Sequence, residues 1–318
     1  MLLNVVHEYL MQAVYFAPRG RMRLLALGHN LSQRYLSPDD NLVGFIGEAG
    51  AGKSLLIRGM FPGLELTNDD DGINVRPLPL IGDADKEHFR THTYHLDARF
   101  ELAFTQPWMV AEAVHKALAK NRRVIIEHFD LIYPFLNMNA QVMIGVGEEV
   151  IVTRPTVYGP EPQEIAGIVF RSIKYRRMAH SAEDITSMIL EEMGLKKPEV
   201  HSDIKHGFVL EFQEKPDIDL ELVERRVDEV IRQDMQICYS DDEHIRVGEN
   251  IYGCTGPRIH VKRTGEITEF KLLKEFRWDP VQKLYTLAGV VGDSGTAGAP
   301  ANSLADYSGK GGGNVEQK

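Results

Sequence analysis

Cysteine is scarce in this sequence: only Cys238 and Cys254 occur among its 318 residues. A disulfide scaffold is therefore not expected, and we predict a cytoplasmic protein. Positive charge is also in deficit, because 36 Lys and Arg residues stand against 46 Asp and Glu, with a formal net charge of -10. This balance argues against an extensive nucleic-acid-coating surface, so any RNA contact would have to be local.

Long hydrophobic runs are also missing. The apolar residues near the N-terminus are interrupted by His7, Glu8 and Gln12, which does not fit the layout of a signal peptide. No run of 18 apolar residues follows, so neither secretion nor a membrane-spanning segment is expected. With 43% hydrophobic and 26% charged residues, the chain has the composition of a globular protein long enough for two cores.

The most specific motif is a GxxxxGK[ST] pattern that follows the apolar run 42–46. We call residues 47–54 the glycine-rich loop; it consists of Gly47, Glu48, Ala49, Gly50, Ala51, Gly52, Lys53 and Ser54. Its glycines would let backbone N–H groups turn toward phosphate oxygens. Lys53 would reach the β- and γ-phosphates, and Ser54 would offer its hydroxyl to Mg²⁺. The motif predicts that the chain binds ATP or GTP together with Mg²⁺.

The pattern of strands and helices predicts an α/β fold of the P-loop NTPase type, with a mainly parallel sheet. The strand-like runs 42–46, 123–127 and 149–153 are separated by helical stretches, among them a crossover helix over 107–120. A further helical stretch covers 160–178. Composition then changes, and we predict a kinase-like nucleotide-binding domain over 1–177, a smaller α+β domain over 178–290 and a flexible tail over 291–318. The expected elements of the smaller domain are a helix over 181–193, a strand over 208–212, a helix over 220–235 and strands within 237–273.

Two acidic residues at the end of the stretch 123–130 are candidates to organise Mg²⁺: Glu127, the last residue of the strand-like run 123–127, and Asp130, three residues later. We favour Glu127 over Asp130 because Glu127 directly follows the apolar residues. The arrangement resembles the uridine kinase branch of P-loop kinases, where such a strand ends in Glu-Gly; here His128 replaces the Gly. A third candidate is Asp70, which either positions an acceptor hydroxyl or acts as its base, or belongs to a solvated turn.

Two further clusters are open to more than one interpretation. The basic residues Arg171, Lys174, Arg176 and Arg177 are either a lid that neutralises transition-state charge or the basic C-terminal end of a helix. The histidines His88, His92 and His95 have no clear partner ligand, so surface or core positions are expected for them rather than a metal site.

Residues 254–267 read Cys-Thr-Gly-Pro-Arg-Ile-His-Val-Lys-Arg-Thr-Gly-Glu-Ile. They resemble the Cys-Gly-Gly-Thr-His-Val-x-x-Thr-Gly-Glu-Ile signature of the alanyl-tRNA synthetase second additional domain, an editing fold shared with threonyl-tRNA synthetase. Residues 180–184 and 208–212 resemble that family's earlier motifs in the same order, so the resemblance covers about 178–275. Taken whole, the chain resembles bacterial alanine-tRNA synthetase second additional domain proteins, in which a kinase-like P-loop domain is joined to an editing-like domain.

The resemblance implies a zinc site made by His180, Asp184, Cys254 and His260. In the family, such a site lies beside a pocket that hydrolyses wrongly charged aminoacyl-tRNA. Asp184 stands where the family has a second helical histidine, and a carboxylate can also bind Zn²⁺. The gap from Cys254 to His260 is longer than in the family, which could move His260 away from the metal. Bound zinc and a retained fold with a remodelled pocket are both left open.

Three functions are compatible with these patterns. The first is a P-loop enzyme that hydrolyses ATP or transfers its phosphate, with the second domain recognising the acceptor. The second is a trans-acting aminoacyl-tRNA deacylase regulated by nucleotide, and the third is a nucleotide-gated binding module without chemistry. The expected partners are a nucleotide and either tRNA or an aminoacyl or nucleoside small molecule, without a membrane. The sequence fixes neither the acceptor nor the oligomeric state.

Overall fold

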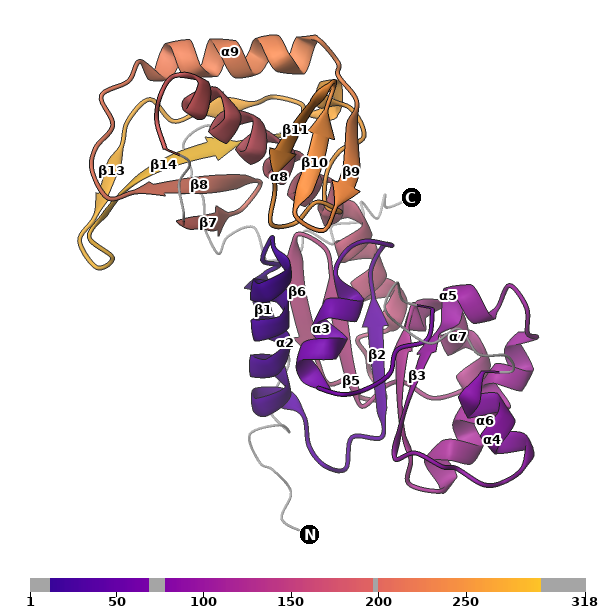
Figure 1. The fold of residues 1–318 in the computed structure, drawn as a ribbon. Helices are drawn as coiled ribbons and strands as arrows, with labels where there is room; N and C mark the ends of the chain where they lie inside the picture. The colour runs from indigo at the N-terminus through magenta and orange to yellow at the C-terminus, as the bar shows by residue number, and fades with distance from the viewer. Residues whose placement is uncertain (1–11, 69–77, 197–199, 293–318) are drawn as a thin grey trace, which may run out of the picture.

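A computed structural model describes residues 12–68, 78–196 and 200–292, which Figure 1 shows as a ribbon. These residues form two groups of strands joined by the long helix α8, Pro162–Glu192. We call the first group the N-terminal sheet and the second the C-terminal strand group. None of the helices in the described part of the chain combines the length and the apolar character that crossing a membrane requires.

The N-terminal sheet has six strands in the order β1-β6-β5-β2-β4-β3. Their bounds are β1 Ala13–Phe16, β2 Leu42–Ile46, β3 Thr93–Asp97, β4 Arg123–Glu127, β5 Val142–Val146 and β6 Glu149–Thr153. Strands β5, β2, β4 and β3 are parallel, whereas β6 and β1 are antiparallel to their neighbours. Strand β2 is buried along its whole length, as expected for a parallel strand covered on both faces. The predicted mostly parallel sheet is confirmed.

One predicted strand runs against the others. Strand β6 lies at the predicted residues 149–153, but it is antiparallel to β5. Only Gly147 and Glu148 connect the two strands. A parallel pair would need a crossover connection of about a dozen residues, so this short link permits only a hairpin.

Helices on the two faces of the N-terminal sheet complete this part of the fold (Figure 1). Their bounds are α2 Arg21–Tyr35, α3 Lys53–Met60, α4 Pro79–Asp85, α5 Ala98–Glu101, α6 Pro107–Ala119 and α7 Phe129–Leu136. Helix α6 confirms the predicted crossover helix. Its first residue is proline, which fits the first helical turn because no intrahelical N–H bond is lost there.

The C-terminal strand group contains a five-stranded and a three-stranded sheet. Its elements are β7 Val200–Ile204, β8 Gly207–Phe212, α9 Leu220–Arg232, β9 Ile237–Asp241, β10 His244–Val247, β11 Asn250–Gly253, the 3₁₀ helix η1 Thr264–Glu266, β12 Lys271–Leu272, β13 Arg277–Asp279 and β14 Leu284–Val290. Helix α9 buries Val223 and Val227 on one face. Asp219 caps it by accepting hydrogen bonds from the N–H groups of Glu221 and Leu222.

The two helices predicted over 160–178 and 181–193 are a single helix, α8. The separate prediction was wrong because a basic cluster was taken as a helix end. No proline or glycine occurs between residues 168 and 193, so nothing in the sequence interrupts the backbone hydrogen bonds there. The predicted domain boundary near residue 177 falls inside this helix, and the division into domains stays a prediction. Asp70 and nearly all of the predicted tail lie outside the described residues.

Candidate functional site

The glycine-rich loop connects β2 to α3, and helix α3 begins at Lys53. Gly50 and Gly52 have φ angles of 78° and 97°, a region that glycine adopts without the strain of a side chain. Gly52 precedes the helix, so no side chain covers the N–H groups of its first turn. This geometry leaves backbone donors and the helix dipole available to an anion, as the motif predicts.

Lys53 and Ser54 both reach the carboxylate at the end of β4. Lys53 Nζ donates to the carbonyl oxygens of Gly47 and Glu48 over 3.1 and 3.0 Å, and lies 3.6 Å from Glu127 Oε2. Ser54 Oγ donates to Glu127 Oε1 over 2.9 Å. The structure therefore brings together the hydroxyl and the carboxylate that were separately predicted to serve Mg²⁺.

A histidine that sequence analysis left without a role also holds Glu127. The Thr67 N–H donates to His95 Nδ1 over 2.9 Å, so Nδ1 is an acceptor and the proton of a neutral ring lies on Nε2. His95 Nε2 lies 3.3 Å from Glu127 Oε1 and donates to it. Burial acts to raise the pKa of Glu127, but the hydrogen bond from His95, the charge of Lys53 and the hydrogen bond from Ser54 lower it to about 2. Glu127 is thus an ionised carboxylate despite its burial.

Asp97 is a second carboxylate at this edge of the sheet, and sequence analysis missed it. It ends β3 and is paired in register with Glu127 at the end of the parallel strand β4. Its side chain accepts from the Phe100 N–H over 3.1 Å and from Asn68 Nδ2 over 3.0 Å. The sequence signal was available, because Asp97 directly follows a strand-like run as Glu127 does. The missing information was that the two strands are neighbours.

Two titratable residues, His128 and Asp130, follow Glu127 in the sequence. His128 has a φ of 55°, a left-handed value that favours glycine. Burial, together with the charge of Lys53, lowers the pKa of His128 to about 4. Asp130 lies in the first turn of α7, where burial raises its pKa and its Oδ1 has no hydrogen-bond partner among the described residues. Of the two carboxylates, Glu127 lines the cavity described below and Asp130 does not.

The basic cluster of α8 supports the glycine-rich loop from outside the site. The guanidinium of Arg176 is fully buried and donates to the carbonyl oxygens of Pro18, Ala51 and Gly147 over 2.8 to 3.2 Å. Burial lowers the pKa of Arg176 to about 9, which leaves it charged at neutral pH. Arg177 forms an ion pair of 2.9 Å with Glu48. The interpretation of these residues as a helix end was wrong, because α8 continues beyond them.

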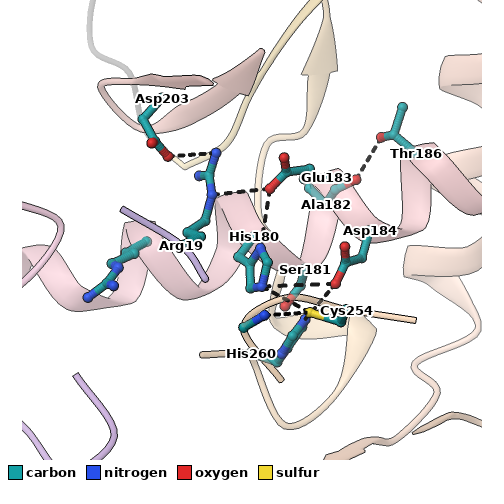
Figure 2. A network of polar contacts seen from close by, with 12 residues as sticks. Arg19, His180, Ser181, Ala182, Glu183, Asp184, Thr186, Asp203, Cys254 and His260 are labelled. Atoms are coloured by element: carbon teal, nitrogen blue, oxygen red, sulfur yellow. Dashed lines mark hydrogen bonds and ion pairs between the residues drawn. The ribbon is translucent and has the colours of Figure 1, made fainter. Parts of the chain in front are cut away.

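The four residues of the predicted zinc site come together, and we call them the His-Asp-Cys-His group: His180, Asp184, Cys254 and His260. His180 and Asp184 lie one turn apart on α8, and the other two flank the segment that follows β11 (Figure 2). All four ligand atoms lie within 4.8 Å of one another. The longer gap between Cys254 and His260 therefore does not separate them.

The distances within this group suit a tetrahedral ion. Cys254 Sγ lies 3.2 Å from His180 Nε2 and 3.8 Å from His260 Nε2. Asp184 Oδ2 lies 2.9 Å from His260 Nε2 and 4.0 Å from His180 Nε2. Zn²⁺ with ligands at about 2.0–2.3 Å would need ligand atoms roughly 3.3–3.7 Å apart, so a small rearrangement would accommodate it.

Neighbouring groups orient the two imidazoles of the His-Asp-Cys-His group. The Nδ1 atom of His180 lies 3.2 Å from Glu183 Oε2, and Glu183 in turn pairs with Arg19 over 3.1 Å (Figure 2). The Nδ1 atom of His260 lies 3.2 Å from the carbonyl oxygen of Pro257. Such contacts point both Nε2 atoms at the centre, as is common around protein-bound metals. Burial lowers the pKa of His180 and so favours the neutral imidazole that metal binding requires.

The two candidate sites lie on either side of one segment of chain. A cavity of about 380 Å³ extends from the glycine-rich loop to the residues that follow Cys254. Its lining includes Gly50, Lys53, Ser54, Asp97, Glu127, His128, Arg21, Arg58, Asp242 and residues 255–259. The volume is of the size found for small-molecule sites in proteins.

No protein-family model matches the chain, and a search of curated proteins found no similar sequence. The geometry of the two candidate sites therefore carries the functional argument.

Proposed function

We propose that the chain binds ATP or GTP with Mg²⁺ at the glycine-rich loop and hydrolyses or transfers the terminal phosphate. The observation that carries this proposal is the 2.9 Å hydrogen bond between Ser54 Oγ and Glu127 Oε1. A loop hydroxyl and a strand-end carboxylate in contact are the pair that holds Mg²⁺ and its water ligands in P-loop NTPases. Lys53, beside the same carboxylate, is the residue that would contact the β- and γ-phosphates.

Each residue at the cavity has a distinct role in this proposal. Lys53 and the N–H groups at the start of α3 bind phosphate oxygens. Ser54 and Glu127 would hold Mg²⁺, which would neutralise the charge that develops during phosphate transfer. Asp97 lines the same cavity as Glu127 and is the candidate to accept a proton from the attacking water or acceptor hydroxyl. The acceptor is proposed as a nucleoside, an aminoacyl compound or a tRNA end.

A second proposal concerns the His-Asp-Cys-His group, which would hold Zn²⁺. Four protein ligands complete a tetrahedron, and such closed sites are structural, whereas catalytic zinc keeps a position open for water or substrate. His180 and Cys254 are 2% and 4% exposed, which limits the approach of a bulky aminoacyl ester. These observations favour a stabilising zinc over the aminoacyl-tRNA deacylase alternative.

The proposed chemistry is tested by measuring phosphate release from ATP at saturating nucleotide and Mg²⁺. Glu127→Gln keeps the size of the side chain and removes its charge, so we expect release to fall by about 100-fold or more, as loss of a preorganised electrostatic group commonly produces. The matched control is Glu112→Gln, whose carboxylate lies on the exposed face of α6 and pairs with Lys116. Equal rates in Glu127→Gln and wild type would contradict the proposed role of Glu127.

A further inference from the structure

The segment 255–259 belongs to both candidate sites. Cys254 and His260 stand at its two ends and supply two of the four side chains of the His-Asp-Cys-His group. Every residue between them lines the cavity at the glycine-rich loop: Thr255, Gly256, Pro257, Arg258 and Ile259. An ion held by the group would therefore fix both ends of this stretch of cavity wall.

Backbone contacts pack this segment tightly between the two sites. The N–H of Arg21, at the start of α2, donates to the carbonyl oxygen of Thr255 over 3.2 Å. A Cβ added to Gly256 would lie 3.1 Å from the backbone nitrogen of Gly20 and 3.1 Å from His180 Nε2. On the other side, the carbonyl oxygen of Arg258 lies 3.5 Å from where a Cβ on Gly50 would stand. A shift of the segment would thus change the space around the glycine-rich loop.

Arg258 gives this wall a positive charge. Its guanidinium lies 4.5 Å from the centre of the Tyr239 ring and donates to the Tyr239 hydroxyl over 3.3 Å. It also lies 3.8 Å from Asp242, and both residues line the cavity. An arginine next to a phosphate-binding loop is suited to phosphate oxygens because its planar donors bind them in pairs.

We infer that segment 255–259 is a second wall of the nucleotide site, that Arg258 contacts the bound phosphates, and that metal in the His-Asp-Cys-His group raises the affinity for nucleotide. This inference rests on the proposed nucleotide binding and adds a link between the two sites. Without the metal, the contacts of Cys254 with His180 and of His260 with Asp184 hold the two ends of the segment, and the nucleotide must supply more of the order of the wall. Because such linkage is reciprocal, nucleotide raises the affinity for metal by the same factor.

The experiment measures the dissociation constant of Mg²⁺-ATP by calorimetry on the full chain in three states: zinc-loaded, metal-stripped with a chelator, and stripped then reloaded with Zn²⁺. We expect affinity to fall about 5- to 100-fold on stripping and to recover on reloading, the range of typical couplings between sites. Cys254→Ser should reproduce the weak state and not recover. Cys238→Ser, which changes the other cysteine, on β9 and outside the group, should behave as wild type.

Arg258→Ala separates the nucleotide contact from metal binding and from folding. It should retain one equivalent of zinc, measured by metal analysis. Its dissociation constant for ATP should nevertheless be at least 10-fold higher than that of the wild type. Its control is Arg263→Ala, because Arg263 pairs with Asp234 and does not line the cavity.

Three results would overturn the inference, and they are distinguishable. Equal ATP affinity in the loaded and stripped states, with Arg258→Ala unchanged, would remove the link and leave the proposed function intact. Absence of ATP binding in every state would refute the proposed function and the inference together. A chain that takes up no zinc would refute the metal-dependent part directly.

Discussion

At the scale of the residue, the carboxylate of Glu127 is held by three side chains. These are Lys53 and Ser54 from the first turn of α3 and His95 from β3. A buried carboxylate with this many partners stays ionised and keeps one orientation. His95 contributes because its own ring is fixed by the N–H of Thr67. His95 is therefore a positioning residue for the proposed Mg²⁺ site.

We predict that His95→Asn weakens the Mg²⁺ dependence of ATP binding. Asparagine is too short to reach Glu127, so a hydrogen bond to a charged group worth about 1.5–3 kcal/mol is lost, and the pKa of Glu127 rises. The Mg²⁺ concentration needed for half-maximal ATP binding should rise about 10-fold, and the loss should grow as the pH is lowered. His92→Asn, at an exposed position on the same segment, is the control. If the Mg²⁺ concentration needed by His95→Asn rises equally at every pH, His95 contributes to folding alone and the proposed effect on Glu127 is contradicted.

Local motifs could be predicted from sequence because their residues are adjacent. The glycine-rich loop and the i,i+4 pair His180 and Asp184 needed only their spacing. Residues 47–52 connect β2 to α3, and Lys53 and Ser54 begin α3, as predicted. Asp97 escaped notice, and His95 was expected only as a surface or core residue, because their importance depends on β3 lying beside β4. That pairing is set by packing between distant segments and leaves no local pattern.

At the scale of the element, helices α2 and α3 approach closely through a pair of glycines. A Cβ on Gly28 would lie 2.3 Å from the Leu56 carbonyl oxygen, and one on Gly59 would lie 2.2 Å from the Leu25 carbonyl oxygen. Both obstacles are helical backbone, which cannot move aside without displacing a helix. Because α3 begins at Lys53, its position relative to α2 also determines where the phosphate-binding residues lie.

We predict that Gly59→Ala destabilises the protein by about 1–3 kcal/mol, the usual cost of overpacking, and also weakens ATP binding. The free energy of unfolding is measured by urea titration, and ATP affinity by calorimetry. The control is Gly167→Ala, because Gly167 lies in α8 with nothing within 4 Å of an added Cβ. Alanine there should raise stability by about 0.5–1 kcal/mol through its better helix propensity. Similar effects of the two substitutions would contradict the close packing of α2 on α3.

Helix α8 was predicted from sequence as two separate helices, although its helical character was recognised. Its apolar periodicity was visible on both sides of residue 177, but the basic cluster there is also typical of a helix end. Two of its residues have other roles: Arg176 is buried against three carbonyl oxygens, and Arg177 pairs with Glu48. Those acceptors come from segments far away in sequence, so only the folded arrangement distinguishes the two interpretations.

At the scale of the whole molecule, α8 is not the only connection between the N-terminal sheet and the C-terminal strand group. Glu148, just before β6, accepts a hydrogen bond of 2.6 Å from the N–H of His206, in the turn between β7 and β8. Burial raises the pKa of Glu148 from its ordinary 4.5 to about 8, and the charge of Glu149 acts in the same direction. The Glu148 carboxyl is thus mostly protonated in the folded protein at neutral pH.

We predict that Glu148 makes the protein less stable as the pH rises. Between pH 4.5 and 8 the folded chain holds a proton that the unfolded chain has released, so the stabilising contribution is complete below pH 4.5 and is lost as the pH rises through about 8. The effect is on the order of a few kcal/mol. Urea titrations at pH 5 and pH 8.5 should show this loss in wild type and a smaller one in Glu148→Gln. An unchanged difference in Glu148→Gln would contradict the raised pKa.

The central claim is that the glycine-rich loop binds a nucleoside triphosphate, and the most direct measurement is a calorimetric titration of Mg²⁺-ATP into wild type and Lys53→Ala. Lys53 would make charge-assisted hydrogen bonds to the phosphates, worth about 1.5–3 kcal/mol, so its loss should weaken binding about 10- to 150-fold. Lys116→Ala, which removes an exposed lysine of α6, should leave the affinity unchanged. Wild type that binds no nucleotide, or Lys53→Ala that binds it equally well, would contradict the claim.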